Sequence, residues 1–579
     1  MFDDLSSEES EVPSLDFSPG AEVPLSGSAG QTAATQALAS AAYRDGPVSD
    51  LLAANEESGF KAARFSLFEP NLGEAFARAV QVRLLGGARK PVIQSFGTEP
   101  QTVVEHCLAA TRIRKERDTR LTVVTAIFGL LFLPGSLLWL IFFQLRRTLS
   151  RINGKREKSL AVAKLAALSG AGGLAASVGA VVLAVLAALV VIAAVAAIQL
   201  PMTGLWLLYL LAMPVAPIVG WWIAKQVSER YAKSLRGHWD ALLGGSGVGP
   251  KVPETVPQDP GDEGAERIRL SLAKLSAEQR SNIVFYAGPK GILGMGTRWG
   301  SWQLAEELVP SDPGREIDGF RSWDVVRAIH DQLRMLERGP LHTGGFPTPT
   351  VRHWVVTPIG EGAKEVSRTE TDSETDAYRV KTFEIQRICN EQQFGSGNRH
   401  YLGTQFVLWD GQLVLTYLIS VTVLHHTLRI EVTGNALGPV HRLFTTKPSP
   451  KTKTVSKSVK FWETKDVQLP LVSAAEVVRL AVRAPFTWFP AVLDYLGGKL
   501  TLPEPFGVRH TWAEKPWRHR FMADDALRAA TPVLRVVHAA AIRVLDEHGC
   551  DTTQFGSGSK ALSGSIPGAE PRKADNYDA

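Results

Sequence analysis

Apolar residues in this chain gather in long uncharged runs, which are the strongest pattern in the sequence. One run extends from Leu165 to Ala224, 60 residues without a charged side chain, and another from Leu121 to Leu145. A helix needs roughly 20 apolar residues to cross a bilayer. We therefore predict an integral membrane protein with helical spans at about 174–200 and 205–224, joined by a short turn.

The shorter run, 121–145, leaves two topologies open. Pro134 and Gly135 lie at its centre, and a proline there removes a helical hydrogen bond. The run is therefore either a kinked third span or a re-entrant hairpin. Small residues in 169–180 would also let helices of several copies pack closely, which allows a homo-oligomer.

Basic residues flank these runs and predict their orientation. Clusters at 146–158 and 225–236 indicate that both flanks face the cytoplasm. We expect a multi-pass plasma-membrane protein, bacterial in type, with its C-terminal domain in the cytoplasm. A further basic cluster at 112–120 conflicts with three full spans, so the side of residues 1–111 stays open.

Short alternating segments follow the linker at 225–264 and predict a cytoplasmic α+β domain at 265–549. Residues 282–287 and 351–357 are typical of strands, and Ser322 can cap a helix over 323–338. Helices are also expected over 473–483, and from Thr531-Pro532 to Gly549, where Thr suits the N-cap and Pro the first turn.

The clearest local pattern covers 401–433. Asp410-Gly411 between two apolar stretches is typical of a tight β-hairpin, because both central residues need positive φ. His425-His426 marks a second turn. We expect an antiparallel meander whose apolar middle strand is covered on both faces.

Charge divides the chain further. Lys and Arg number 63 and Asp and Glu 58, a net charge of +5, yet residues 1–60 hold eleven acids and one base. We predict a disordered acidic tail at 1–60, a juxtamembrane segment at 61–120 with one or two helices or strands, and a disordered tail at 550–579. Three cysteines exclude a disulfide scaffold.

Three stretches, FLPGSLLW, NIVFYAG and RHYLGTQFVLWDGQLVLTYLISV, carry a resemblance. Together with the basic flanks, they resemble uncharacterised multi-pass membrane proteins of actinobacteria, over roughly residues 90–550. That group has no assigned activity. The resemblance implies plasma-membrane placement, and it transfers no catalytic residue to this chain.

A glycine-rich stretch at 288–300 is the candidate phosphate loop. Gly294, Gly296 and Gly300 have G-x-G-x-x-x-G spacing, which differs from the dinucleotide fingerprint. Such a loop binds phosphate only where a helix begins directly after it. The alternative is a glycine-rich hairpin between two strands.

Other chemistry is sparse in the sequence. It contains no H-E-x-x-H, paired C-x-x-C or G-x-S-x-G motif, so we expect no catalytic residue, no metal site and no cofactor. Arg399 and His400, after a Gly/Ser/Asn turn, could bind an anion at a strand edge or be ordinary surface residues.

Two basic stretches, 442–465 and 509–520, suit anionic lipid headgroups, a solvated loop or, less well, nucleic acid. The candidate headgroup ligands are Lys451, Lys453, Lys457, Arg509, Lys515, Arg518 and Arg520.

The leading functional hypothesis is a membrane-anchored scaffold or regulatory protein whose cytoplasmic domain binds a protein or anionic lipid. One alternative is a subunit of an oligomeric transporter or channel. Another is a membrane enzyme acting on lipid or nucleotide.

Overall fold

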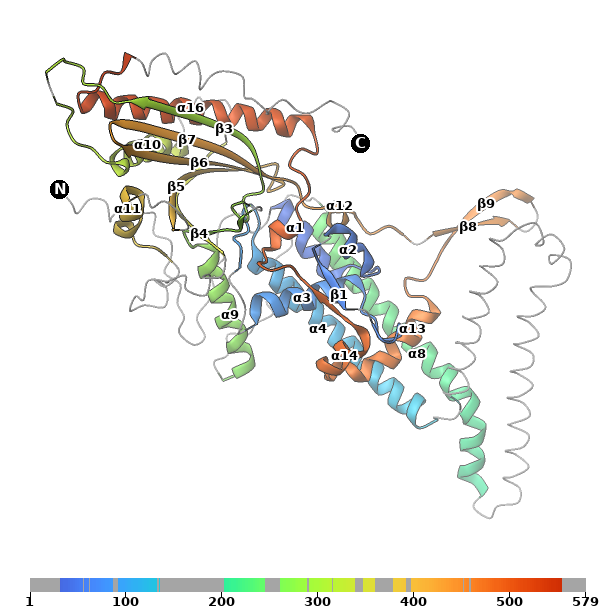
Figure 1. The fold of residues 1–579 in the computed structure, drawn as a ribbon. Coiled ribbons are helices and arrows are strands. Elements are labelled where there is room, and N and C mark those ends of the chain that lie inside the picture. Colours follow the sequence, from blue (N-terminus) through green and yellow to red (C-terminus); the bar gives the residue numbers. More distant parts are fainter. Residues whose placement is uncertain are drawn as a thin grey trace.

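A computed structural model describes residues 32–132, 135, 203–244, 261–338, 347–359, 379–391 and 397–553, apart from gaps at 56, 62, 87–91, 289–290, 315, 451 and 458–459. The described elements form a twisted sheet with helices on one face and, beside it, a body of helices (Figure 1).

The sheet has six described strands: β2 (Ile283–Tyr286), β3 (Thr297–Glu307), β4 (Thr350–Pro358), β5 (Arg399–Leu408), β6 (Leu413–Leu424) and β7 (Thr427–Leu437). Their order is β2-β4-β5-β6-β7-β3. The β2–β4 pair is parallel and every other pair is antiparallel. The predicted α+β character and the β5–β6–β7 meander are therefore present.

The turns of the meander are close to those predicted. Trp409, Asp410 and Gly411 all have positive φ, and the loop is two residues longer than a tight hairpin because the strands end at Leu408 and resume at Leu413. The second turn contains His425 and His426, whose φ values of 44° and 54° suit a two-residue hairpin.

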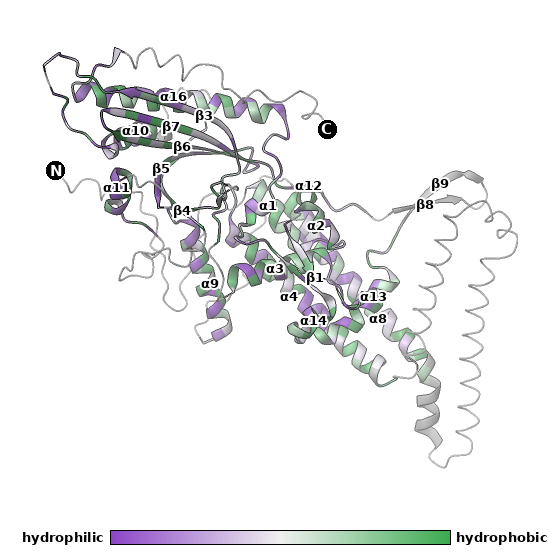
Figure 2. Cartoon of the chain, viewed as in Figure 1, coloured by the Kyte–Doolittle hydropathy of each residue, from purple (hydrophilic) through white to green (hydrophobic). Residues whose placement is uncertain are grey.

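Two helices, α10 (Ser322–Arg338) and α16 (Arg520–Glu547), cover one face of the sheet, while α11 (Thr382–Glu391) lies beside β5 (Figure 1). Polar and apolar residues alternate along α10 and α16 (Figure 2). Their apolar sides bury Val325, Ile329 and Val533 against the sheet. Tyr417 of β6 is fully buried there and donates a hydrogen bond from its hydroxyl to the carbonyl of Ala526 (2.7 Å).

The start predicted for α16 at Thr531-Pro532 is wrong. The helix begins at Arg520 and holds Pro532 in its interior. The apolar stripe of Met522, Ala526 and Val533 is buried against the sheet and carries the helix past the proline.

The body of helices contains these described elements: α1 (Ala33–Ser40), η1 (Ala41–Tyr43), α2 (Ser49–Ala54), α3 (Leu72–Leu85), α4 (Pro100–Val124) continued by η2 (Thr125–Leu130), α8 (Thr203–Leu243), α9 (Glu263–Gln279), α12 (Arg442–Thr445), α13 (Ala474–Arg483), η6 (Ala484–Trp488), α14 (Pro490–Gly497) and α15 (Val508–Thr511). Two small sheets, β1 (Gly59–Lys61) with β10 (Lys499–Thr501) and β8 (Thr452–Lys457) with β9 (Lys460–Gln468), complete the described elements. Figure 1 shows the β8–β9 hairpin projecting away from the rest.

Part of the predicted acidic tail is folded. Residues 33–43 form α1 and η1, with α1 packed against α4 and α8. Tyr43 is buried and its hydroxyl lies 3.0 Å from His106 Nδ1. The prediction averaged charge over 1–60, whereas the alanine-rich run at 33–43 has no charge and can be buried. Residues 1–31 lie outside the described residues.

The prediction of a multi-pass membrane protein is also wrong. Among the helices that the structure describes, none has both the length and the apolar character that a membrane crossing needs. The plasma-membrane localisation was predicted from those spans, so it is wrong for the same reason. The segment at 174–200 lies outside the described residues, and the one at 121–145 is described only at 121–132 and 135.

The predicted span at 205–224 lies within α8, which continues without a break through Lys225 and Arg230 to Leu243. Leu121 of α4 and Ala224 of α8 are buried together with Val477 and Leu480 of α13. The length of an apolar run does not say whether protein or lipid covers it. Here other parts of the chain cover both of these residues.

Candidate functional site

The sheet divides between β5 and β6. Their ladder runs from Leu408↔Leu413 to Leu402↔Ile419. Beyond that point, residues 399–401 pair with β4, and residues 420–424 pair with β7. The two strands therefore separate, and we call the opening between 399–401 and 420–424 the β5–β6 cleft.

The start of α10 holds the two sides of this cleft in place. The backbone N–H of Val423 in β6 donates to the Ser322 hydroxyl (3.1 Å), and that of Trp323 donates to the Asn390 side-chain oxygen in α11 (3.0 Å). The Trp323 ring also contacts His400 of β5, with ring centroids 5.9 Å apart. One helix terminus is thus bonded or packed against β6, α11 and β5 together.

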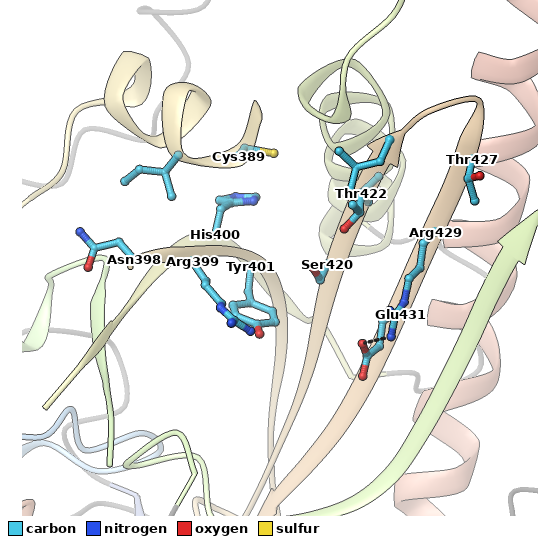
Figure 3. A pocket seen from close by; sticks show the side chains of 13 residues that line it. Cys389, Asn398, Arg399, His400, Tyr401, Ser420, Thr422, Thr427, Arg429 and Glu431 are labelled. Carbon is cyan, nitrogen blue, oxygen red and sulfur yellow. Dashed lines mark hydrogen bonds and ion pairs between the residues drawn. The ribbon is translucent and has the colours of Figure 1, made fainter. Parts of the chain in front are cut away.

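A pocket of about 390 Å³ occupies the cleft. Figure 3 shows Arg399 and Tyr401 on the β5 side and Ser420, Thr422, Arg429 and Glu431 on the β6–β7 side, with His400 and Cys389 near α11. The lining residues are Ile388, Cys389, Asn398, Arg399, His400, Tyr401, Ser420, Val421, Thr422, Leu424, Thr427, Arg429 and Glu431.

The charges around the pocket are mainly positive. Arg399 and Arg429 are exposed, and Glu431 is the acidic residue among the lining residues. Arg429 lies 3.3 Å from Glu431, with half of its side-chain surface still exposed. Arg298 of β3 lies at a longer 3.6 Å from the same carboxylate. Two guanidinium groups therefore share one carboxylate, and Arg399 places another guanidinium on the β5 side of the pocket.

The histidines beside the pocket do not add to that charge. His353 Nδ1 and His400 Nε2 lie 3.0 Å apart, and the His330 ring stacks on His353 at 4.8 Å. Burial, followed by the proximity of His400 and His330, lowers the pKa of His353 well below its ordinary value. Burial lowers the pKa of His400 to about 3. Both rings are therefore neutral at neutral pH, and one donates a hydrogen bond to the other.

The thiol of Cys389 is not poised for nucleophilic attack. Burial raises its pKa to about 12, helped by the negative charge of Asp324. The thiolate is the reactive form of cysteine, so this residue stays protonated. Nor do His330, His353 and His400 form a metal centre, since no set of three or more His, Cys, Asp or Glu in the described part of the chain could hold an ion.

The glycine-rich candidate loop does not have the geometry of a phosphate site. Gly294 and Gly296 have φ of +86° and +82°, but Gly300 lies inside strand β3. Residues 292 and 293 turn back onto β2 through the Tyr286↔Ile292 bridge. A strand follows the loop, so the helix N-terminus that would bind phosphate is missing at this place.

The headgroup candidates are not brought together. Lys453 and Lys457 lie in β8, and Lys451 lies outside the described residues. Arg509 is fully buried in α15, where it donates to the carbonyls of Gly411, Gln412 and Gly438, so it is not available to a headgroup.

The other three candidates follow Arg509 in sequence. Lys515 and Arg520 are exposed, whereas Arg518 pairs with Glu514 (2.7 Å) and donates to the carbonyl of Val440. The exposed candidates Lys515 and Arg520 therefore lie in a different segment from Lys453 and Lys457 of β8, and Arg509 is a buried structural residue.

Sequence reasoning named Arg399 and His400 as a possible anion site at a strand edge, and both line the pocket. It missed Ser420, Thr422 and Arg429. The sequence signal for Ser420 and Thr422 was the polar–apolar alternation at 420–423, near the end of the middle strand. In the structure both residues are only half-buried, whereas Leu413–Ile419 is buried on both faces. The prediction that the middle strand is covered on both faces is therefore correct only for its first seven residues, 413–419.

A family model described as the AbeC-like domain matches residues 301–570, somewhat less than half of the chain. The match includes every residue of the pocket and the helices α10, α11 and α16. It supports the resemblance noted above only at the level of a family without an assigned activity, and says nothing of actinobacteria or membrane spans. No curated protein and no solved structure matches the chain.

Proposed function

We propose that this chain is a scaffold or regulatory protein that binds a partner protein, and that the β5–β6 cleft holds an acidic, extended segment of that partner. The observation that carries the proposal is the charge of the cleft, where Arg399 and Arg429 line the pocket against one acidic lining residue, Glu431. Arg298, outside the pocket lining, contacts the same Glu431 carboxylate. Arginine presents a planar set of donors that matches carboxylates, often in bidentate pairs.

The shape of the cleft also suits an extended segment. It opens between two strands that have separated, so a bound chain would lie between β5 and β6 with hydroxyl groups of Ser420 and Thr422 beside it. Side-chain hydroxyls can both donate to and accept from a peptide backbone. The neutral His400 and protonated Cys389 favour binding over catalysis.

A peptide-display experiment tests this proposal. A random peptide library is panned on the full-length chain, and enriched peptides are measured by fluorescence polarisation. We expect peptides rich in Asp and Glu, at least tenfold weaker binding to Arg399→Glu and Arg429→Glu, and weaker binding at high salt. Arg528→Glu on α16, where 79% of the arginine side chain is exposed, is the matched control.

Three results would overturn the proposal. One is an enriched set without acidic residues, and another is binding that neither cleft reversal changes. The third is binding through the same arginines to vesicles of phosphatidylserine and phosphatidylcholine without any peptide binding, which would assign the cleft to lipid instead.

A further inference from the structure

Strand β3 forms an open edge of the sheet. It pairs with β7 on one side, and within the described part of the chain no strand pairs with its other side (Figure 1). Eleven residues long, it has no charge or proline from Trp299 to Ala305. Proteins usually protect such an edge with lysine, proline or a short strand, because its unpaired N–H and C=O groups recruit another strand.

The two faces of β3 differ. Trp302 and Leu304 are buried on the face that α16 covers, while Ser301, Gln303 and Ala305 are exposed on the other. A β-bulge at Trp299 lets Arg298 and Gly300 oppose successive residues of β7. Arg298 lies opposite Asn435 of β7, and Glu307 lies opposite Thr427. Those two β7 residues are an even number of positions apart and therefore share a face, so Arg298 and Glu307 both lie on the open face.

We propose that β3 pairs antiparallel with β3 of a second copy of this chain, with Gln303 on the twofold axis. In that register Ser301 faces Ala305 and Trp302 faces Leu304. The bulge then brings Arg298 opposite Glu307, so that two charge pairs flank the centre by symmetry. Opposite charges facing each other stabilise adjacent strands, whereas like charges destabilise them.

Charge is the reason for choosing a second copy as the occupant. The open face has a base at one end of β3 and an acid at the other, and antiparallel self-pairing is the arrangement that brings each to its complement. Arg298 is available, because 58% of its side chain is exposed and its contact with Glu431 is long. A C2 contact of this kind is isologous and closes after two copies.

The dimer would join the two sheets into one and bring two β5–β6 clefts into one assembly. Binding of a partner with two acidic segments would then gain from effective concentration. The dimer does not depend on what the cleft binds. It can therefore be confirmed or refuted independently of the proposed function.

Cysteine cross-linking gives the register directly. The three native cysteines are buried. Full-length Gln303→Cys treated with copper phenanthroline should form a disulfide-linked dimer, because both thiols lie at the axis. Ala305→Cys alone is the matched control. Its two copies would lie roughly 13 Å apart along the strands, too far for a disulfide, whereas a mixture of Ala305→Cys with Ser301→Cys should cross-link.

Charge reversal provides a second measurement by analytical ultracentrifugation. Arg298→Glu or Glu307→Arg places like charges opposite each other and should weaken the dimer at least tenfold, and the double reversal should restore it. Both residues are exposed, so the fold should persist in circular dichroism. A dimer with a Kd of about 1 µM would be the main species at a concentration of about 100 µM. A chain that stays monomeric at that concentration, together with a Gln303→Cys variant that does not cross-link, overturns the proposal. Reversals without effect, or equal cross-linking of the Ala305→Cys variant alone, overturn this register.

Discussion

The hydroxyl of Ser322, the first residue of α10, accepts a hydrogen bond from the backbone N–H of Val423 in β6 at 3.1 Å. Val423 lies beyond the last β5–β6 pair, so its N–H cannot bond to β5 in that ladder. Buried backbone groups almost always have a partner. A helix residue supplies it here, which allows the two strands to separate and form the cleft.

Replacing Ser322 with alanine should therefore destabilise the protein. The side chain is buried, and its removal leaves the Val423 N–H without this partner, at a cost of about 1–3 kcal/mol. Urea unfolding measures the change, and hydrogen exchange of the Val423 amide should quicken. Ser311→Ala, at an exposed position, is the control and should stay near wild type. Equal stability of both variants would contradict the role of Ser322.

The buried pair of Glu74 and Arg483 should contribute far more than a surface pair. Arg483 donates through both terminal nitrogens to the two carboxylate oxygens. Burial alone would raise the pKa of Glu74, but Arg483, with Arg114 and Arg117, lowers it to about 2. Glu74→Gln leaves a buried guanidinium without its carboxylate and should cost about 3–5 kcal/mol.

The exposed pair of Glu384 and Arg387 on α11 provides the comparison. Glu384→Gln should cost less than about 1 kcal/mol. Because the folded pKa of Glu74 lies below its unfolded value, its contribution is present above about pH 4.5 and is lost as the pH falls towards 2. Urea titrations across this range should show a smaller loss for Glu74→Gln than for wild type.

Pro532 should be a weak point of α16, since it lies in the helix interior. An interior proline is about 3 kcal/mol less favourable than alanine, so Pro532→Ala should raise the thermal midpoint. Thr531→Ala should be nearly neutral, because the Thr531 hydroxyl only bonds back to the Leu527 carbonyl. A helix starting at Thr531 would reverse this order, with Thr531→Ala costing about 1 kcal/mol.

The histidine pair should make stability depend on pH. The folded pKa of His353 and of His400 lies below the ordinary value, so the unfolded chain takes up protons first as pH falls. Stability should decline from pH 6.5 towards pH 3, by up to about 1.4 kcal/mol per pH unit for each ring. His400→Gln should flatten this slope, whereas His425→Gln, in an exposed turn, should not.

Local sequence signals predicted much of the α+β domain. The strands β2 and β4, the helices α10 and α13 and the β5–β6–β7 meander all follow from alternation, caps and turn residues. Ser473 indeed caps α13 by accepting from the N–H of Glu476. These features are decided within a few residues of the chain. The helix start predicted at Thr531-Pro532 was wrong because burial of the apolar stripe of α16 stabilises the helix by more than one interior proline destabilises it.

The candidate site could be predicted only in part. Arg399 was visible as a basic residue after a turn, but its place opposite Arg429 depends on the separation of β5 from β6. No local pattern encodes that separation, because it requires Ser322, about 100 residues before Val423, to reach β6.

The sequence by itself determined β2, β4, α10, α13 and the β5–β6–β7 meander, because hydrophobic period and turn chemistry act over short distances. Only the tertiary structure decided what covers the apolar surfaces. It buried Leu121 and Ala224 against α13, folded the alanine-rich run of residues 33–43 between α4 and α8, and left β3 at an open edge. Burial depends on residues far apart in the chain, and the type of an apolar residue does not indicate which partner will cover it.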